Sequence, residues 1–391
     1  MRHIYLDYNA TAPVHSEVLE AFTAFYRERY GNPSSIHWAG RRVKGAVEKA
    51  REKVALLLNC EPVEVVFTSC GTEADNMAVK GVAAALHDRG NHIITTRAEH
   101  PAVVNSCLAL ESQGFEVTWL GVDSDGMPDL AELEEAITPK TILISLMLAN
   151  HETGVLLPVR EIGEIAARRR VYFHCDAVQA VGKVPVDFKG MNAGLLALSG
   201  HKLYAPKGVG ALVVRKGVKL APLIHGGPQE RNRRAGTENV AGIVALGKAC
   251  ELALDAMTAD MRRIAALRAR LEEGLMAAIP DVRVNGGRER RLPNTTNLSF
   301  LGAEADSLLL NLDLAGIAAS SGAACSSGTL KHSHVLAAMG VEPAAAGGSV
   351  RFSLGRENTA ADVEYLLDVL PGIVERLRGK YNAEFGVRNA E

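Results

Sequence analysis

The chain lacks the cysteine patterns that staple or metallate small proteins. Its six cysteines are Cys60, Cys70, Cys107, Cys175, Cys250 and Cys325, and they form no C-x-x-C pair and no Cys/His spacing typical of structural zinc. A chain of 391 residues can bury a large core without such staples. The pattern excludes a zinc-stapled module and predicts reduced thiols in a cytoplasmic protein.

An excess of charge of one sign and long apolar runs are also missing. The net charge is −2, and the absence of long basic or acidic runs argues against direct nucleic-acid or membrane partners. No apolar run is long enough to span a bilayer, and the chain enters Ile4-Tyr5-Leu6-Asp7 without a leader-like segment. The local cluster Arg231, Arg233 and Arg234 is either a solvated loop or an anion-handling element near a site.

The composition that is present is that of a soluble globular protein, and the length suits two domains. Strand-like apolar runs alternate with helix-like stretches, which predicts a mostly parallel sheet covered by helices, with sites at the carboxyl ends of strands. We expect strands at 63–67, 92–95, 116–120, 141–147, 171–174, 195–198 and 210–214, and helices at 73–87 and 159–169.

A second region follows a long Ala/Leu/Arg-rich helix predicted over 240–278. Strand-like segments at 296–300, 317–320 and 348–352 and a final helix at 360–378 predict a smaller α+β domain. We expect a large domain over residues 15–258, and a small domain made of residues 1–14 and 259–391.

Lys202 is the first candidate for chemistry. It follows an apolar run that ends at Leu198 and opens into Ser199-Gly200-His201, which indicates a buried strand leading into a site. A partly desolvated lysine loses its proton more easily and becomes a nucleophilic amine. Asp176 ends another strand-like run and could pair with a protonated ring nitrogen, although a helix N-cap is the ordinary role of such an aspartate. Pyridoxal phosphate needs this lysine and this acid together.

The segment Thr68-Ser69-Cys70-Gly71-Thr72-Glu73 lies between a predicted strand and a predicted helix. Free backbone N–H groups and the positive end of a helix make such a turn suitable for phosphate. Serine and threonine there can also serve only as helix caps.

Three further residues are candidates, each with a plainer alternative. His100 follows a strand and could stack on a flat cofactor or move protons, or be merely structural. Arg351 lies inside a strand-like run, so its guanidinium group is expected to be buried and to need an anionic partner. That partner is either the carboxylate of a bound ligand or an acidic side chain in an internal salt bridge. Cys325 lies in the small, Gly-punctuated stretch 320–328, which is typical of a mobile loop with an accessible thiol. Core packing is expected for the other five cysteines.

Together these motifs resemble the cysteine desulfurases of the NifS/IscS type, which are fold-type I pyridoxal-phosphate enzymes of the class-V aminotransferase kind. The most specific segments are Ser199-Gly200-His201-Lys202, Asp176-Ala177-Val178-Gln179, Arg234-Ala235-Gly236-Thr237-Glu238-Asn239 and Arg351-Phe352-Ser353-Leu354. Several segments are most similar to the nitrogen-fixation-type members. The resemblance implies a seven-stranded, mostly parallel sheet and a small domain that carries the cysteine loop at about 320–332.

The resemblance also implies a role for each matching residue. Lys202 would hold the cofactor covalently, Asp176 would face its pyridine nitrogen, Gln179 its phenolic oxygen, and His100 would stack on the ring. Phosphate would be bound by Gly71, Thr72, Ser199 and His201, with Thr237 contributed by the partner subunit of a homodimer. Gly200 would also belong to the cofactor-binding set. Asn9, Asn150 and Arg351 would hold the substrate carboxylate, with Asn150 also near the cofactor. Cys325 would carry the sulfur, and could transiently ligate an iron–sulfur cluster; no other metal site is expected.

The implied reaction converts L-cysteine into L-alanine and a persulfide on Cys325, which passes its sulfur to an iron–sulfur scaffold or another acceptor. A selenocysteine lyase, or a related lyase or aminotransferase that uses the same cofactor, is the nearest alternative. A non-catalytic sulfur-relay protein is the alternative from another class, and Lys202 with Asp176 argues against it because a relay needs neither.

Overall fold

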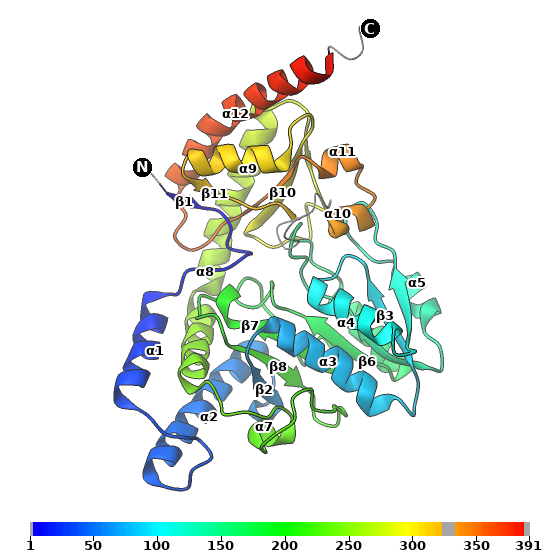
Figure 1. The fold of residues 1–391 in the computed structure, drawn as a ribbon, viewed down its shortest axis with the longest axis vertical. Helices are drawn as coiled ribbons and strands as arrows, with labels where there is room; N and C mark the ends of the chain where they lie inside the picture. Colours follow the sequence, from blue (N-terminus) through cyan, green and yellow to red (C-terminus); the bar gives the residue numbers. More distant parts are fainter. Residues whose placement is uncertain (1–2, 323–332, 387–391) are drawn as a thin grey trace.

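A twisted seven-stranded sheet forms the centre of the larger part of the molecule (Figure 1). The computed structural model describes residues 3–322 and 333–386, with side chains to residue 379. The strand order is β2 (Val65–Thr68), β8 (Gly210–Val214), β7 (Leu195–Ser199), β6 (Tyr172–Asp176), β5 (Thr141–Ser145), β3 (His92–Thr96) and β4 (Glu116–Leu120). Only β8 runs antiparallel to its neighbours, so the predicted mostly parallel sheet is confirmed.

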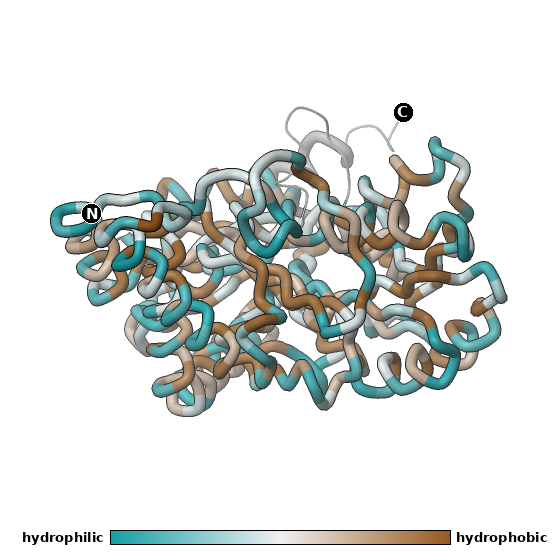
Figure 2. Tube along the Cα trace, turned by 90° about the horizontal axis from the view of Figure 1, so that it is seen from below, coloured by the Kyte–Doolittle hydropathy of each residue, from teal (hydrophilic) through white to brown (hydrophobic). Residues whose placement is uncertain are grey.

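Helices cover both faces of this sheet because successive strand residues point to opposite sides. Leu195 and Ala197 of β7 join one apolar cluster with α3 (Gly71–Leu86). Leu196 and Leu198 join another with α2 (Trp38–Leu58), α6 (Val159–Arg169) and α8 (Val240–Ala278). Figure 2 shows the hydrophobic strand segments gathered inside the hydrophilic outer turns. The helices of this part are α1 (Ser16–Glu28), α2 (Trp38–Leu58), α3 (Gly71–Leu86), α4 (Pro101–Glu111), α5 (Leu130–Ala136), α6 (Val159–Arg169), the short α7 (Gln229–Asn232) and α8 (Val240–Ala278).

A smaller region with a separate apolar core lies beside the sheet. It contains the antiparallel sheet β12-β10-β9 and the parallel pair β1-β11. Its elements are β1 (Ile4–Tyr5), β9 (Val282–Val284), β10 (Thr295–Phe300), α9 (Ala305–Leu314), β11 (Ile317–Ala318), α10 (His334–Ala338), α11 (Pro343–Ala346), β12 (Ser349–Ser353) and α12 (Ala360–Gly386).

Helix α8 joins the two regions along one side of the molecule (Figure 1). Its first half, including Leu246 and Ala253, packs in the core under the large sheet, and its second half, including Leu267 and Leu275, packs in the smaller core. The predicted domain boundary at residue 258 falls inside this helix. The two-domain division of the chain stays a prediction.

The predicted elements differ from the structure mainly at their ends. Pro62 opens a short 3-10 helix, η1 (Pro62–Glu64), so the strand expected from residue 63 begins at Val65. The strand expected at 317–320 ends at Ala318, and Ser320 forms only an isolated bridge with Arg351. Helices α1, α2, α4 and α5 are not among the elements predicted above.

A buried ion pair ties the loop after β8 to the sheet. Both Arg51 and Glu230 expose 3% of their side chains, and two N–O contacts of 2.8 Å join them. Glu230 also accepts from the backbone N–H of Phe67 at 2.9 Å, close to the end of β2. This pair therefore fixes the loop that carries Arg234 and Thr237 against the strand that leads into the predicted phosphate turn.

We expect the substitution Arg51→Lys to lower the free energy of unfolding by about 2 kcal/mol, because lysine keeps the charge but loses the two-pronged contact. Urea unfolding followed by circular dichroism measures the change. Arg42→Lys, at an exposed position of the same helix, should change stability by less than about 0.5 kcal/mol. Equal stability of the two variants would show that the Arg51 fork contributes nothing beyond its charge.

Candidate active site

One cavity of about 180 Å³ lies at the carboxyl ends of the central strands. Strand β6 ends at Asp176, and β7 ends at Ser199, which leads into the 3-10 helix η2 (Gly200–Lys202). Helix α3 begins beside them at Gly71, three residues after β2 ends at Thr68. Of the sequence-predicted residues, the cavity wall contains Gly71, Thr72, His100, Asp176, Gln179, Ser199, His201 and Lys202.

Lys202 lies between this cavity and a second, smaller one. Its Nζ donates to the backbone oxygens of Asn9 and Ala10, the latter at 2.8 Å. These carbonyls belong to the N-terminal segment that follows β1. The amine is therefore held at the junction of the two regions, at the edge of the predicted cofactor site.

Asp176 is buried at the base of the cavity, with 6% of its surface exposed. Its Oδ1 accepts from the backbone N–H of Val178 at 2.9 Å, so Asp176 also caps the turn that follows β6. Burial, with a smaller contribution from the charge of nearby Asp75, raises the pKa of Asp176 to about 7. A buried carboxyl of this kind favours a cationic partner, because pairing restores its ionised form.

Asp75 and His174 are buried polar side chains close to Asp176. Burial raises the pKa of Asp75 to about 8 and lowers the pKa of His174 to about 4, so both favour their neutral forms at pH 7. The His174 Nε2 lies 3.5 Å from the Asp75 Oδ1, while its Nδ1 is 2.9 Å from the Ser145 hydroxyl. Asp75 lines the cavity, and sequence reasoning missed it because an aspartate within a helix gives no local signal.

His100 caps helix α4, with Pro101 as the first helical residue. Its Nδ1 accepts from the Ala102 N–H at 3.1 Å. Burial and then the charges of Lys202 and His334 lower the pKa of His100 to about 4, so the ring is neutral at pH 7. Because Nδ1 accepts, the proton of the neutral ring lies on Nε2. In this arrangement the neutral His100 ring is a hydrogen-bond donor, through Nε2–H, at the cavity wall.

The start of α3 forms an anion cradle opposite the end of β7. A Cβ at position 71 would lie 2.7 Å from the Val178 side chain, so only glycine allows this close approach. The buried Ser199 hydroxyl has no hydrogen-bond partner within the described residues, and it faces the same cavity. The first backbone N–H groups of α3 and this hydroxyl suit a phosphate.

Arg234 supports the cradle from outside. Its guanidinium contacts both carboxylate oxygens of Glu73, at 2.8 and 3.2 Å, and Glu73 accepts from the Ser69 N–H at 2.8 Å. The loop with the arginine cluster is thus neither purely solvated nor a direct anion site at this position, because Arg234 is paired with a carboxylate of the cradle helix.

Several predicted residues do not line the cavity in this chain. The Asn150 side chain closes its own turn, accepting from the N–H groups of Glu152 and Thr153 at 2.9 and 3.0 Å. Gly200 is buried at the start of η2, and Thr237 is exposed on the loop before α8. Asn9 is held in a network of amides and lysines described below.

Arg351 forms the internal salt bridge that was one of its two predicted alternatives. Its Nη2 lies 2.8 Å from the Asp7 carboxylate, and its Nη1 donates to the His151 carbonyl at 2.9 Å. Its buried Nε has no hydrogen-bond partner among the described residues. Its role toward a substrate stays a prediction.

The cysteines separate into different environments. Cys60, Cys107, Cys175 and Cys250 are buried, as expected, and burial raises the pKa of each thiol. For Cys70 the expected core packing is wrong: its thiol is half-buried, lines the cavity, and accepts from the Glu73 N–H at 3.4 Å as the cap of α3. Cys325 lies outside the described residues.

These residues fit pyridoxal phosphate. The cradle offers N–H and hydroxyl donors for a phosphate, Lys202 an amine for the aldehyde, and Asp176 a buried acid for the ring nitrogen. Ligand atoms of Asp75, His100 and Asp176 lie within 4.8 Å of one another, close enough to hold a metal ion, but two of them, His100 and Asp176, are side chains predicted to contact the cofactor. We therefore assign no metal there.

Within residues 3–322 and 333–386, none of the helices combines the length and the apolar composition that a membrane span requires.

Comparison with known proteins agrees with this geometry. The aminotransferase class-V family model matches residues 4–366. The chain is 54% identical over 378 residues to cysteine desulfurase 2 of Trichormus variabilis, covering 97% of this chain and 94% of the relative. It is 50% identical over 379 residues to the cysteine desulfurase IscS of a Clostridium botulinum strain, with 96% of both chains covered.

Solved structures show the same fold. A NifS-like protein superimposes with a TM-score of 0.91 at 40% identity, covering 96% of this chain and all of the other. A structure described as SspA in complex with cysteine gives a TM-score of 0.80 at 36% identity, over 90% of this chain and 98% of the other. Enzymes of this family depend on pyridoxal phosphate. This chain belongs to the class-V aminotransferase family.

Proposed function

We propose that the protein is a cysteine desulfurase that takes sulfur from L-cysteine, releases L-alanine and holds the sulfur as a persulfide on Cys325. One observation carries the proposal. Lys202 and Asp176 line one cavity together with a phosphate cradle, in a chain about half identical to cysteine desulfurases over nearly its whole length. Both residues are needed to use pyridoxal phosphate, and a passive sulfur relay needs neither.

When bound, pyridoxal phosphate supplies an electron-withdrawing ring that weakens the bonds around the substrate Cα and thereby the carbon–sulfur bond. Asp176 would keep the ring nitrogen protonated, because its carboxylate is stable in this buried place only beside a cation. The Lys202 Nζ would bind the cofactor at rest and take the Cα proton once the substrate has displaced it. The cradle of Gly71, Thr72, Ser199 and His201 would fix the phosphate.

His100 would stack on the ring and present its Nε2–H to the reacting atoms. Its neutral state follows from burial near Lys202. To remove a proton from the substrate thiol, its Nδ1 would first have to give up the cap of α4. The resting geometry therefore favours His100 as a hydrogen-bond donor before it acts as a base.

Cys325 would accept the sulfur. Its thiolate would form the new S–S bond as the substrate carbon–sulfur bond breaks, and the electron pair of that bond would stay with carbon, which is then protonated to give the alanine methyl group. The reaction balances as a thiol plus cysteine giving a persulfide plus alanine, with no outside oxidant. Burial disfavours the thiolate at four of the five described cysteines, which supports a sulfur carrier elsewhere in the chain.

Arg351, with Asn9 and Asn150, is proposed to hold the substrate carboxylate. The Arg351 guanidinium is already oriented by Asp7 and the His151 carbonyl. A substrate carboxylate would bind this oriented guanidinium group, whose planar set of N–H donors suits a bidentate contact.

We further propose a homodimer in the cytoplasm that delivers sulfur to an iron–sulfur scaffold or another acceptor protein. Thr237 is exposed in one chain, so it could complete the phosphate site of a partner subunit. Each described cysteine carries a free thiol, as suits a reducing compartment.

Incubation with L-cysteine followed by mass spectrometry of Cys325 tests the function. We expect a mass gain of one sulfur atom on Cys325 in the wild-type protein, and none in Cys325→Ala, which should keep its cofactor absorption. Cys60→Ala serves as the control, because Cys60 is buried away from the cavity and should leave the Cys325 persulfide intact. Alanine release without any protein persulfide would contradict the proposal.

A further inference from the structure

A second lysine lies behind the candidate site. The Lys183 Nζ donates to the Gln179 Oε1 at 2.7 Å and to the Asn9 Oδ1 at 3.0 Å. Gln179 lines the cofactor cavity, and Asn9 offers its backbone oxygen to Lys202. Lys183 therefore contacts a residue that lines the cavity, Gln179, and a residue that holds the Lys202 amine, Asn9, although the sequence motifs give Lys183 no role.

The Lys183 amine decides which way the Gln179 amide faces. A lysine ammonium group can only donate hydrogen bonds, so the Gln179 atom beside it must be the oxygen. The Gln179 Nε2 is thereby turned the other way, where it donates to the Asn9 backbone oxygen at 2.9 Å. Gln179 thus presents an N–H donor, as an acceptor oxygen on a cofactor ring requires.

Asn9 is oriented in the same way. Its Oδ1 accepts from Lys183 and from the Asn294 Nδ2 at 3.1 Å, so its own Nδ2 is left to donate to the Thr295 hydroxyl at 2.9 Å. The Asn9 side-chain oxygen thus has only donors as partners, and its nitrogen donates to an acceptor. Asn9, from the N-terminal segment, therefore connects the smaller region to both lysines.

Lys183 also adds positive charge next to Lys202. Burial and then the charge of Lys202 lower the pKa of Lys183 well below its ordinary value. Two features favour its ammonium form: the side chain is only half-buried, and its Nζ donates to two amide oxygens. Joining Lys202 to the cofactor would also remove the second of the two lowering causes. The electrostatic effect is mutual, because each ammonium disfavours a second positive charge nearby. A neighbouring cation is a known means of making a lysine amine available as a nucleophile.

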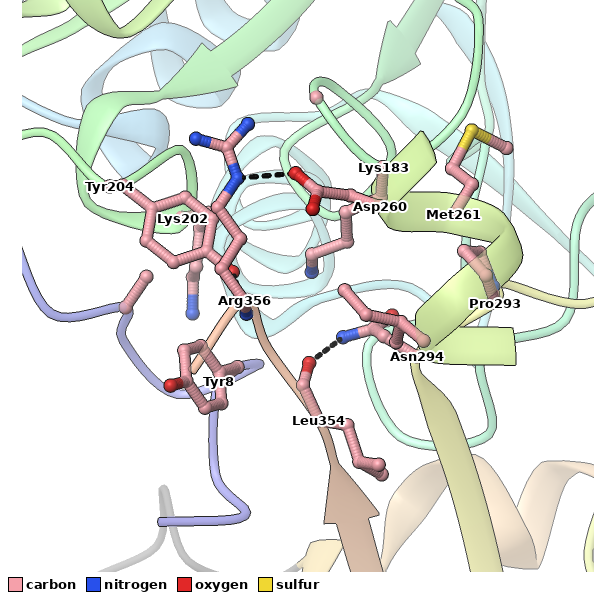
Figure 3. Close-up of a pocket in the computed structure, with 13 residues that line it drawn as sticks. Tyr8, Lys183, Lys202, Tyr204, Asp260, Met261, Pro293, Asn294, Leu354 and Arg356 are labelled. Carbon is pink, nitrogen blue, oxygen red and sulfur yellow. Dashed lines mark hydrogen bonds and ion pairs between the residues drawn. The ribbon is translucent and has the colours of Figure 1, made fainter. Parts of the chain in front are cut away.

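Both amines line a small pocket between the two regions. Figure 3 shows Lys183 and Lys202 projecting into it beside Tyr8 and Asn294. Its volume of about 30 Å³ holds about one water molecule, so it is not a site for an organic ligand.

Other charged groups around the amines do not cancel this effect. Arg356 and Asp260 in the small pocket neutralise each other through a contact of 2.7 Å. Tyr8 and Tyr204 line the same pocket, and burial raises the pKa of both, so they stay neutral. Arg351 adds positive charge, and on the cofactor side the titratable groups are Asp75, His100, His151, Asp176 and His201.

The backbone beside Lys183 allows the segments that carry Lys183 and Lys202 to pack closely. Gly182 has φ of +77°, and a Cβ there would lie 1.9 Å from the side chain of Leu203, the residue after Lys202. Only glycine permits this approach of the two lysine-bearing segments.

We propose that Lys183 is a positioning residue of the active site, which fixes the amides of Gln179 and Asn9 and sets a second positive charge against the Lys202 amine. This inference rests on the proposed attachment of the cofactor to Lys202. It predicts that the charge of Lys183, and not merely its bulk, controls the proton affinity of the nitrogen that joins the cofactor to the protein.

The test is a pH titration of the visible absorption of the holoenzyme, without substrate. In Lys183→Met the absorption midpoint should move up by about one pH unit, roughly tenfold in the protonation equilibrium, because removing a nearby cation stabilises the protonated nitrogen. Lys183→Arg should stay within about 0.3 units of wild type, since a guanidinium is also cationic and can only donate. Lys189→Met is the matched control, because that exposed lysine pairs with Glu61 and should leave the midpoint unchanged.

Equal midpoints in wild type and Lys183→Met would overturn the inference, as would an upward shift of the same size in Lys183→Arg. If Lys183→Met does not fold, Lys183→Gln, which keeps a polar group without charge, must show the upward shift instead. The titration needs no turnover, so it is separate from the proposed function. A wild-type protein with a normal absorption midpoint but no Cys325 persulfide would contradict only the desulfurase proposal.

Discussion

Replacing Lys202 with alanine should reduce the release of alanine from L-cysteine by at least about 10³-fold, because one amine supplies both the covalent hold on the cofactor and the base for the Cα proton. The position of Lys202 in the structure supports both roles for the one amine. Lys202 lies at the end of β7, on the wall that also carries Asp176 and the phosphate cradle. The measurements are the rate of alanine formation and the cofactor that stays with the protein after sodium borohydride reduction and denaturation.

The matched control is Lys216→Ala, at an exposed position after β8, which should keep both wild-type turnover and the reducible cofactor bond. Added methylamine, a small substitute for the missing amine, should restore part of the rate in Lys202→Ala. Turnover close to wild type in Lys202→Ala would place the reactive amine elsewhere.

Replacing Asp176 with asparagine should lower turnover by roughly a hundred- to several thousand-fold, because the change removes one partner of a buried ion pair, worth about 3–5 kcal/mol. Asparagine keeps the shape and the cap on Val178, so the fold and cofactor binding through Lys202 should persist. The measurements are turnover and the cofactor content of the purified protein. A fall in turnover at full cofactor content is the expected pattern.

Asp88→Asn is the control for this substitution, since Asp88 is exposed beyond the end of α3. Asp176→Glu, which keeps the charge on a longer side chain, should recover part of the lost rate. If Asp176→Asn turned over as fast as wild type, Asp176 would be a turn cap only, which was its alternative role in the sequence.

The sequence carries clear signals wherever one segment alone defines the environment. The five-residue buried strands are predicted because each is an apolar run that ends in small or polar residues, as at Leu195–Ser199 before Lys202. Helix α2 could have been found the same way. Val43, Val47, Val54 and Leu58 recur at helical spacing and are buried, but the surrounding Lys and Arg residues obscure that face.

The helix ends depended on chemistry that the sequence shows only in part. Helix α3 starts at Gly71, two residues before its predicted start, because the Cys70 sulfur accepts from the Glu73 N–H as the cap. Cysteine is not among the preferred cap residues, so the pattern gave no start signal there. Once Cys70 serves as the cap, Gly71 and Thr72 become the free N–H groups of the cradle.

The sequence by itself determined which residue types end the strands, and therefore that Lys202, Asp176, His100 and the phosphate turn lie at one edge of a mostly parallel sheet. Only the tertiary structure decided which hydrogen-bond partners and neighbouring charges these groups have. Asn9 accepts from the Lys202 amine, and Lys183 and Asn294 both donate to the Asn9 side chain from segments far apart in the chain. Asp75 lies close to Asp176, and Arg351 forms an ion pair with Asp7. The reason is physical: periodicity and turn chemistry act over a few residues, whereas amide orientation and the charge state of a buried group are set by whatever the folded chain packs against it.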